Sequence, residues 1–183
     1  MSSPLPFRYS YWAEPGKILA GCCPGSAEGY MLPEQLGALI DAGVTLIVNL
    51  MEKSETELMG VFMDSYELML PGVAEARGKT IRVERFPIVD RSIPTVEEMK
   101  RILGRIRKEL ADGGAVYVHC LGGIGRTGTV IGCYFVEQGE ADPLGRLKKL
   151  TEPESDYFWP TPQTQEQRNF VLKWKEAKNS SGS

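Results

Sequence analysis

The sequence predicts an α/β fold whose central sheet, four- or five-stranded and mainly parallel, is flanked by helices. Two apolar, β-branched segments, at residues 44–50 and 115–119, are typical of strands buried on both faces of a parallel sheet. Between them, apolar residues recur at helical spacing over residues 95–111. Glycines or prolines stand near several of the junctions, as expected where strands and helices alternate.

The first half of the chain is expected to contain three strands and two helices. The strands are predicted at residues 16–21, 44–50 and 80–86, after a proline-rich, aromatic N-terminal segment. One helix, over residues 33–42, begins with a proline and is ended by Gly43. Residues 54–76 are mixed in composition, and we expect a helix there despite the break at Pro71-Gly72.

The second half has clearer boundaries. Thr95, followed three residues later by Glu98, forms a capping box that starts the helix over residues 95–111. The apolar stripe of this helix should face the core and consists of Val96, Met99, Leu103, Ile106 and Leu110. Its other side is expected to be a solvated basic face and carries Lys100, Arg101, Arg105, Arg107 and Lys108. After the strand at residues 115–119, helices are predicted around residues 127–138, 142–150 and 163–178.

Length, composition and net charge limit the classes of protein to which this chain can belong. The 183 residues, of which 42% are hydrophobic and 25% charged, are enough to bury one sizeable core. We therefore expect a single domain over residues 1–178, followed by a disordered tail over residues 179–183. A net charge of −3 argues against a nucleic-acid partner. No apolar run approaches the roughly 18–20 residues of a membrane-spanning helix, and the N-terminus lacks an export pattern, so we expect a cytoplasmic protein.

Cysteine usage is typical of a reducing compartment. The four cysteines, Cys22, Cys23, Cys120 and Cys133, are too few and too irregularly spaced for a disulfide framework. No cysteine pair with nearby histidines suggests a metal site, and we expect none. Cys22 and Cys23 could protect Cys120 by forming a disulfide on oxidation, but small buried thiols are the preferred interpretation.

The most informative segment lies at residues 116–128, where a cysteine and an arginine stand six positions apart around a glycine-rich turn. The turn joins a predicted strand to a predicted helix, where backbone N–H groups and the helix dipole bind anions. The residues that would surround a bound phosphoryl group are Leu121, Gly122, Gly123, Ile124 and Gly125. Arg126 can add a bidentate fork to two phosphate oxygens. The same donors would stabilise a nucleophilic thiolate at Cys120.

The run His119-Cys120-x5-Arg126-Thr127-Gly128 resembles the signature loop of the cysteine-dependent protein tyrosine phosphatases. The glycine-rich residues between Cys120 and Arg126 most resemble those of the compact dual-specificity branch of that superfamily. The resemblance implies that Cys120 attacks phosphorus to give a phosphocysteine, that Arg126 holds the phosphoryl oxygens, and that Thr127 assists the sulfur as leaving group. It also implies that His119, the only histidine of the chain, orders the loop. No metal or organic cofactor is implied.

Two further segments fit this family. A phosphatase of this kind needs a general acid on a movable upstream loop, and Asp90 lies on the loop predicted between the strand at 80–86 and the helix at 95–111. Near the C-terminus, residues 163–170 resemble the glutamine segment that positions the hydrolytic water in tyrosine phosphatases. Gln163 is the closest match and Gln167 the second choice, while a plain helix-capping role fits this polar turn equally well.

We expect a metal-independent phosphatase that hydrolyses phosphotyrosine in a phosphoprotein or phosphopeptide substrate, with a shallow site open to phosphoserine or phosphothreonine. Two alternatives remain: a phosphoresidue-binding pseudophosphatase, and a phosphoinositide or inositol-phosphate phosphatase. The residues between Cys120 and Arg126 are uncharged, which argues against polyphosphorylated substrates. The basic side of the helix over residues 95–111, in contrast, could bind such substrates. The run Gly123-x-Gly125-x-x-Gly128 also matches a dinucleotide-binding fingerprint, but the residues after the following helix do not supply the acidic strand end that such a domain needs.

Overall fold

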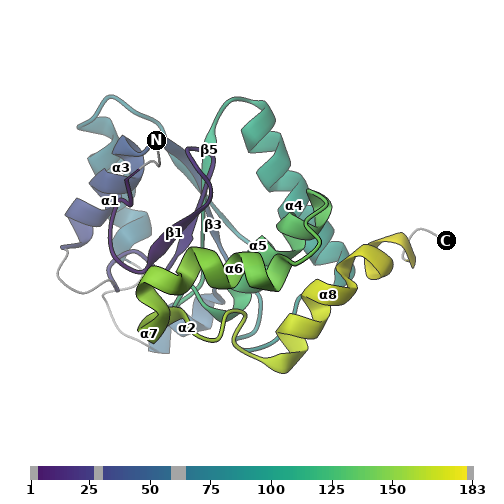
Figure 1. The fold of residues 1–183 in the computed structure, drawn as a ribbon. Helices are drawn as coiled ribbons and strands as arrows, with labels where there is room; N and C mark the ends of the chain where they lie inside the picture. Colours follow the sequence, from purple (N-terminus) through teal and green to yellow (C-terminus); the bar gives the residue numbers. More distant parts are fainter. Residues whose placement is uncertain (1–3, 27–30, 59–64, 181–183) are drawn as a thin grey trace.

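The computed structural model describes residues 4–26, 31–58 and 65–180 and has the predicted α/β fold (Figure 1). In this part of the chain, five strands form one sheet in the order β1-β2-β5-β3-β4. The strands are β1 (Ser10–Glu14), β2 (Ile18–Gly21), β3 (Val44–Asn49), β4 (Arg82–Arg85) and β5 (Ala115–His119). Strands β2, β5, β3 and β4 run parallel, and β1 pairs with β2 in the antiparallel sense. The expectation of a mainly parallel sheet is confirmed.

The register of the sheet aligns the carboxyl ends of its four parallel strands. Gly21 of β2 pairs with His119 of β5, His119 pairs with Asn49 of β3, and Asn49 pairs with Arg85 of β4. The loops that follow these four residues therefore leave the sheet at one edge. In open α/β sheets, ligands bind at this edge.

Helices cover both faces of the sheet. They are α1 (Leu32–Asp41), α2 (Lys53–Leu58), α3 (Ser65–Glu75), α4 (Val96–Ala111), α5 (Gly125–Glu137), α6 (Pro143–Thr151), α7 (Ser155–Phe158) and α8 (Gln165–Ser180), with a 3-10 turn at Glu152–Glu154. Figure 1 shows α1 and α3 together on one side, and α4, α5, α6 and α8 on the other. Helix α5 is buried nearly all round, as expected of the central helix of that layer.

Several boundaries differ from the sequence prediction. Strand β1 was not predicted, and it lies within the aromatic N-terminal segment, where Tyr11 and Trp12 are buried. The helix expected over residues 54–76 corresponds to α2 and α3, with residues 59–64 outside the described part. Pro71 lies inside α3 instead of breaking it, because Tyr66, Leu70 and Ala74 pack one face of that helix into the core. Packing thereby outweighs the hydrogen bond that the proline removes.

The C-terminal helix has the predicted length but begins and ends two residues later than expected. Helix α8 continues to Ser180, so residues 179 and 180 are helical where a disordered tail was predicted. Residues 181–183 lie outside the described part. A short helix, α7, and the 3-10 turn before it were also not predicted, since each is only a few residues long and leaves no periodic pattern.

Helix α4 matches its prediction closely. Thr95 and Glu98 form the expected capping box, with the Glu98 backbone N–H donating to Thr95 Oγ1 at 3.2 Å. The side expected to be a solvated basic face is largely ion-paired. Arg105 pairs with Glu84 and Glu109, Arg107 with Glu137, and Lys108 with Asp112. Most of this positive charge is therefore matched by carboxylates of the same chain.

A buried carboxylate stabilises the amino-terminal end of the sheet, opposite the loops. Glu109 accepts hydrogen bonds from Thr45 Oγ1 at 2.6 Å, Arg82 Nη2 at 2.8 Å and Arg105 Nη2 at 2.9 Å. Although burial opposes its ionisation, these donors hold the pKa of Glu109 below its ordinary value. In the described residues, no helix is both long and apolar enough to cross a membrane.

Candidate active site

The cysteine-containing loop lies between the end of β5 and the start of α5, at the carboxyl edge of the sheet. Cys120 follows β5 directly and is almost fully buried. Gly123 has a φ of +73°, and a Cβ at this position would lie 2.3 Å from the carbonyl carbon of Gly21. Only glycine meets both conditions. The Leu121 carbonyl accepts a hydrogen bond from the Cys23 backbone N–H at 2.8 Å, which ties the loop to the segment after β2.

The loop opens into the N-terminus of α5. A Cβ on Gly125, the first residue of this helix, would lie 2.9 Å from Gln167 Oε1 and 3.3 Å from the Cβ of Gln163, so glycine is needed for this contact as well. The first backbone N–H groups of a helix have no acceptor within it. They end the loop that follows Cys120 and form, with the helix dipole, a favourable environment for an anion.

Arg126 is 1% exposed and its side chain is almost completely hydrogen-bonded. Nη1 donates to Glu55 Oε1 at 2.6 Å and to the Ile88 carbonyl at 3.0 Å. Nη2 donates to Glu55 Oε2 at 2.8 Å and lies 2.9 Å from Asp90 Oδ1. Nε is buried, and no described residue accepts its hydrogen. A guanidinium has five N–H donors. Three of them donate to Glu55 and Ile88, which leaves Nε and the second Nη2 hydrogen, beside Asp90, for a ligand.

Glu55 was not identified from the sequence. It lies in α2, within the stretch of mixed composition, and nothing in the sequence there indicates that an isolated glutamate would contact the loop of Cys120. Although burial opposes its ionisation, the hydrogen bonds from Arg126 hold the pKa of Glu55 below its ordinary value. Glu55 therefore remains a carboxylate and fixes the orientation of the guanidinium.

Asp90 lies on the loop between β4 and α4, as predicted. Its side chain is 56% exposed and reaches the site through its ion pair with Arg126. Arg91, the next residue, has a φ of +62°, in the left-handed region that non-glycine residues rarely adopt. The loop is also bound to the start of α8, because Gln167 Nε2 donates to the Ser92 carbonyl at 3.0 Å.

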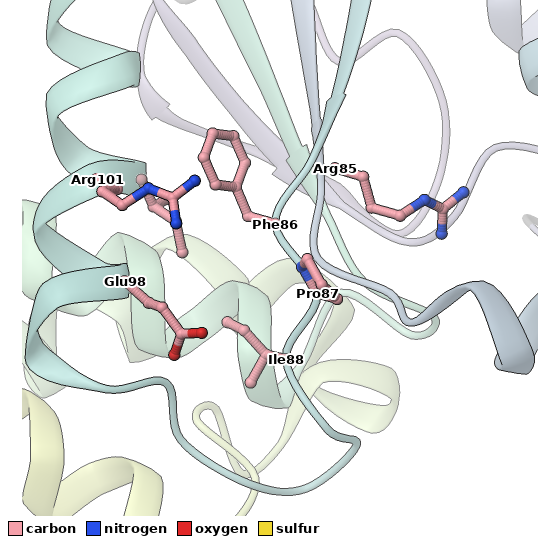
Figure 2. Close-up of a pocket in the computed structure, with 7 residues that line it drawn as sticks. Arg85, Phe86, Pro87, Ile88, Glu98 and Arg101 are labelled. Atoms are coloured by element: carbon pink, nitrogen blue, oxygen red, sulfur yellow. The ribbon is translucent and has the colours of Figure 1, made fainter.

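Figure 2 shows the base of this loop. Pro87 and Ile88 leave β4 there, and Glu98 and Arg101 approach from α4 around a cavity of about 50 Å³. Arg85 points to the opposite side of the chain, where Nη2 donates to Glu67 Oε1 at 2.6 Å. The cavity is separate from the loop that contains Cys120 and is too small for an organic substrate.

His119 is fully buried behind the cysteine and takes part in a chain of hydrogen bonds. Its Nδ1 lies 3.0 Å from the Cys120 carbonyl, which can only accept, so Nδ1 is the protonated nitrogen. Its Nε2 accepts from the hydroxyl of Tyr66 at 3.0 Å, and that hydroxyl accepts from Asn49 Nδ2 at 3.0 Å. Burial lowers the pKa of His119 to about 4, and the charges of Arg85 and Arg126 act in the same direction. His119 is therefore neutral at pH 7 and connects the Cys120 carbonyl to the Tyr66 hydroxyl.

The remaining predicted residues occupy distinct positions. Thr127 is buried next to Arg126 at the start of α5, and no described group bonds its Oγ1. Gln163 is exposed beside Gly125. Gln167 is buried, and its Oε1 accepts from the Thr164 backbone N–H at 3.0 Å while the Gln167 N–H donates to Thr164 Oγ1. The amide of Gln167 is thus used for capping α8 and for holding the Asp90 loop, which leaves Gln163 as the more accessible glutamine.

The other cysteines lie away from solvent. Cys22, Cys23 and Cys133 are free thiols with no exposed surface. Burial raises the pKa of the Cys22 thiol to about 11 and that of Cys133 well above its ordinary value. These properties fit the preferred interpretation of small buried thiols.

Comparison with known families gives one match that covers most of the chain. Residues 7–177 match the family model described as PTP-SAK, the Swiss Army Knife protein, DSP-PTPase phosphatase domain. Two curated proteins of Methanocaldococcus jannaschii, the uncharacterized proteins MJECL20 and MJ0215, are 35% and 34% identical over 88 and 92 residues. These alignments cover 48% and 50% of this chain, and this chain spans only 56% and 54% of those proteins.

Solved structures share the fold. The crystal structure of Tk-PTP in the active form is 24% identical, covers 94% of this chain and 97% of its own, and has a TM-score of 0.64. PTPMT1 in complex with PI(5)P is 16% identical, with coverages of 96% and 99% and a TM-score of 0.65. TpbA of P. aeruginosa, in a cysteine-to-serine form in complex with pTyr, is 13% identical, with coverages of 100% and 96% and a TM-score of 0.64.

Proposed function

Because this chain belongs to the family of the Swiss Army Knife protein, DSP-PTPase phosphatase domain, we propose that it hydrolyses phosphotyrosine in proteins through a phosphocysteine at Cys120. Phosphoserine and phosphothreonine are secondary substrates. The reaction uses no metal ion. The observation that carries the proposal is the arrangement around Arg126, whose guanidinium lies on the loop of Cys120, contacts Asp90 at 2.9 Å and keeps its buried Nε available.

The first chemical step is displacement at phosphorus. The Cys120 thiolate forms the S–P bond while the ester P–O bond breaks, and the neutral carboxyl of Asp90 gives its proton to the departing oxygen. The loop N–H groups and Arg126 bear the charge of the equatorial oxygens in the transition state. The proposed role of Thr127 is to donate a hydrogen bond to the sulfur when it later leaves, and this is supported by its buried Oγ1, to which no described group is bonded.

The second step is hydrolysis of the phosphocysteine. Asp90, now a carboxylate, takes a proton from water as the water oxygen forms its bond to phosphorus. The S–P bond breaks, which releases inorganic phosphate and restores the thiolate. Gln163, accessible beside Gly125, is the residue proposed to orient this water.

Binding of substrate changes the partners of Arg126. A phosphoryl group that takes a bidentate bond from Arg126 needs Nε together with the adjacent Nη2. In the unliganded protein, Asp90 Oδ1 lies 2.9 Å from Nη2 and occupies this position. We expect the phosphoryl oxygens to displace Asp90 from Arg126, which frees the carboxyl group for the leaving oxygen.

A phosphoinositide is the second candidate substrate class, since a relative of the same fold is known in complex with PI(5)P. The test is phosphate release by the purified full-length chain from three substrates: a phosphotyrosine peptide, a phosphoserine peptide and short-chain phosphatidylinositol 5-phosphate. We expect the phosphotyrosine peptide to give the highest kcat/KM. Faster release from the lipid would replace the proposed substrate class, and binding without release would indicate a phosphoresidue-binding module.

A further inference from the structure

An aromatic side chain that the sequence did not point to lies at the rim of the loop of Cys120. The hydroxyl of Tyr157, in α7, is 3.6 Å from the position that a Cβ on Gly122 would occupy. Ile124 Cδ1 lies 3.5 Å from the same position. Gly122 is half-buried, so Tyr157 and Ile124 border the loop where its interior meets solvent.

Tyr157 is held in place by other aromatic rings. Its ring stacks on that of Tyr9 with a centroid separation of 3.8 Å and an angle of 14°. It also meets the buried ring of Phe158 edge-on at 5.1 Å. Tyr9 is itself buried and lies in the segment before β1. Because Tyr157 is already ordered, a contact with a ligand costs little side-chain entropy.

Tyr157 also borders a surface pocket of about 340 Å³. It is lined by Arg8, Tyr9, Pro153, Glu154, Ser155, Asp156 and Tyr157. Arg8 forms an ion pair with Glu154 at 3.3 Å, whereas Asp156 is exposed and forms no ion pair with another described residue. The pocket therefore has a surplus negative charge, which repels a second phosphate on the substrate.

We infer that Tyr157 is the specificity-determining residue for the leaving group, and that it selects aryl phosphates by packing its ring against the phenyl ring of a bound phosphotyrosine. The inference rests on the proposed function and names the substrate class that this site prefers. A phosphoryl group held inside the loop directs its ester group outward, past Gly122 and the Tyr157 ring. Aromatic pairs of this kind contribute affinity beyond the apolar area that they bury. The acidic pocket behind Tyr157 takes the adjoining peptide and disfavours a phosphoinositide headgroup.

The test measures the contribution of the phenyl ring to binding, without turnover. Phenylphosphonate and methylphosphonate are titrated into the protein by calorimetry, and the ratio of their affinities is the readout. We expect Tyr157→Ala and Tyr157→Leu to reduce this ratio by about 2- to 12-fold, the range that one aromatic contact supplies. Tyr157→Phe keeps the ring and should keep the ratio, which separates packing from a role of the hydroxyl.

The control variant is Trp159→Ala. Trp159 is also aromatic, is 61% exposed two residues away, and lies over the ammonium group of Lys148 at 5.1 Å, outside the lining of the pocket. Its substitution should leave the ratio unchanged. An unchanged ratio in both Tyr157→Ala and Tyr157→Leu, or an equal loss in Trp159→Ala, overturns the inference.

Failure of the inference and failure of the proposed function give different results. If the native protein hydrolyses a phosphotyrosine peptide but binds the two phosphonates equally well, only the role of Tyr157 is overturned. If it hydrolyses no phosphotyrosine peptide, the proposed function fails, and the phosphonate ratios still decide the role of Tyr157. If neither phosphonate binds, the role of Tyr157 is overturned, and hydrolysis of the phosphotyrosine peptide alone decides the proposed function.

Discussion

Two hydrogen bonds, of 2.6 and 2.8 Å, join the guanidinium of Arg126 to the carboxylate of Glu55 and set the plane of the fork. Glu55 lies in α2 and Arg126 at the start of α5, so the pair connects the loop after β3 to the loop after β5. The bonds occupy one N–H on each Nη atom. Nε and the Nη2 hydrogen that contacts Asp90 are the groups left to bind a phosphoryl group.

Glu55→Gln should therefore impair catalysis more than stability. The variant keeps the size of the side chain but loses the charge and one of the two acceptors that orient Arg126. Misplacement of a catalytic group by about 1 Å can cost about 100-fold in rate, and we expect a loss of that order in kcat/KM for p-nitrophenyl phosphate. Glu52→Gln removes a nearby charge, whereas the contact of Glu52 with Glu55 is made by its backbone N–H and is kept, so this variant should behave as the native protein. Equal activities of the two variants would contradict the role of Glu55.

Replacement of Asp90 should have two separable effects. Asp90→Ala removes the proton donor, so hydrolysis should slow by about 100-fold or more for phenyl phosphate, whose leaving group is poor, and less for p-nitrophenyl phosphate. It also frees Nη2 of Arg126, so inorganic phosphate should inhibit at lower concentration. Asp142, which caps α6 by accepting from the Gly145 N–H at 2.9 Å, provides the comparison variant Asp142→Asn. A leaving-group effect in that variant, and none in Asp90→Ala, would show that the acid is misassigned.

The lowered pKa of His119 predicts that the free energy of unfolding depends on pH. Its pKa is about 4 in the folded protein and 6.5 in the unfolded chain, so the unfolded state binds more protons between these values. Stability is therefore complete above pH 6.5 and decreases as the pH falls toward 4, by up to about 3 kcal/mol. Urea unfolding between pH 7 and 5, where carboxylates titrate little, should show this slope. His119→Asn should reduce it, and an identical slope in the variant would contradict the prediction.

Glu109 should affect stability without affecting activity. It is the buried acceptor for Thr45, Arg82 and Arg105 at the end of the sheet opposite Cys120. Removing one partner of a buried ion pair typically costs about 3–5 kcal/mol, and because Arg82 is partly exposed we expect Glu109→Ala to lie near the lower end. Thermal unfolding and kcat/KM measured on the same sample test this. A drop in kcat/KM at a temperature where the variant is fully folded would count against it.

Local sequence patterns were sufficient for the elements that position the loop. The apolar run before Cys120 predicted β5 with both of its boundaries, and the Thr95/Glu98 capping box predicted the start of α4. Asp90 lies on the loop between β4 and α4, and the observed strand order brings that loop near the cysteine, since β4 and β5 flank β3 in the sheet. The contact of Asp90 with Arg126 follows from that topology.

Residues whose role depends on tertiary contact could not be predicted. Glu55 and Tyr157 are common residue types in segments without periodicity, and their importance arises only when α2 and α7 pack against the loop. Gln167 shows the converse. The sequence could not distinguish water positioning from capping, and the structure shows its amide bonded to Thr164 and Ser92.

The central claim is that Cys120 is the nucleophile, and the most direct test compares the native protein with Cys120→Ser. Hydrolysis of p-nitrophenyl phosphate is measured with EDTA and a thiol reductant present, and vanadate binding is measured in parallel. We predict turnover by the native protein, none by Cys120→Ser, and retained vanadate binding by both, because the loop N–H groups and Arg126 are unchanged. Undiminished turnover by Cys120→Ser would contradict the covalent mechanism.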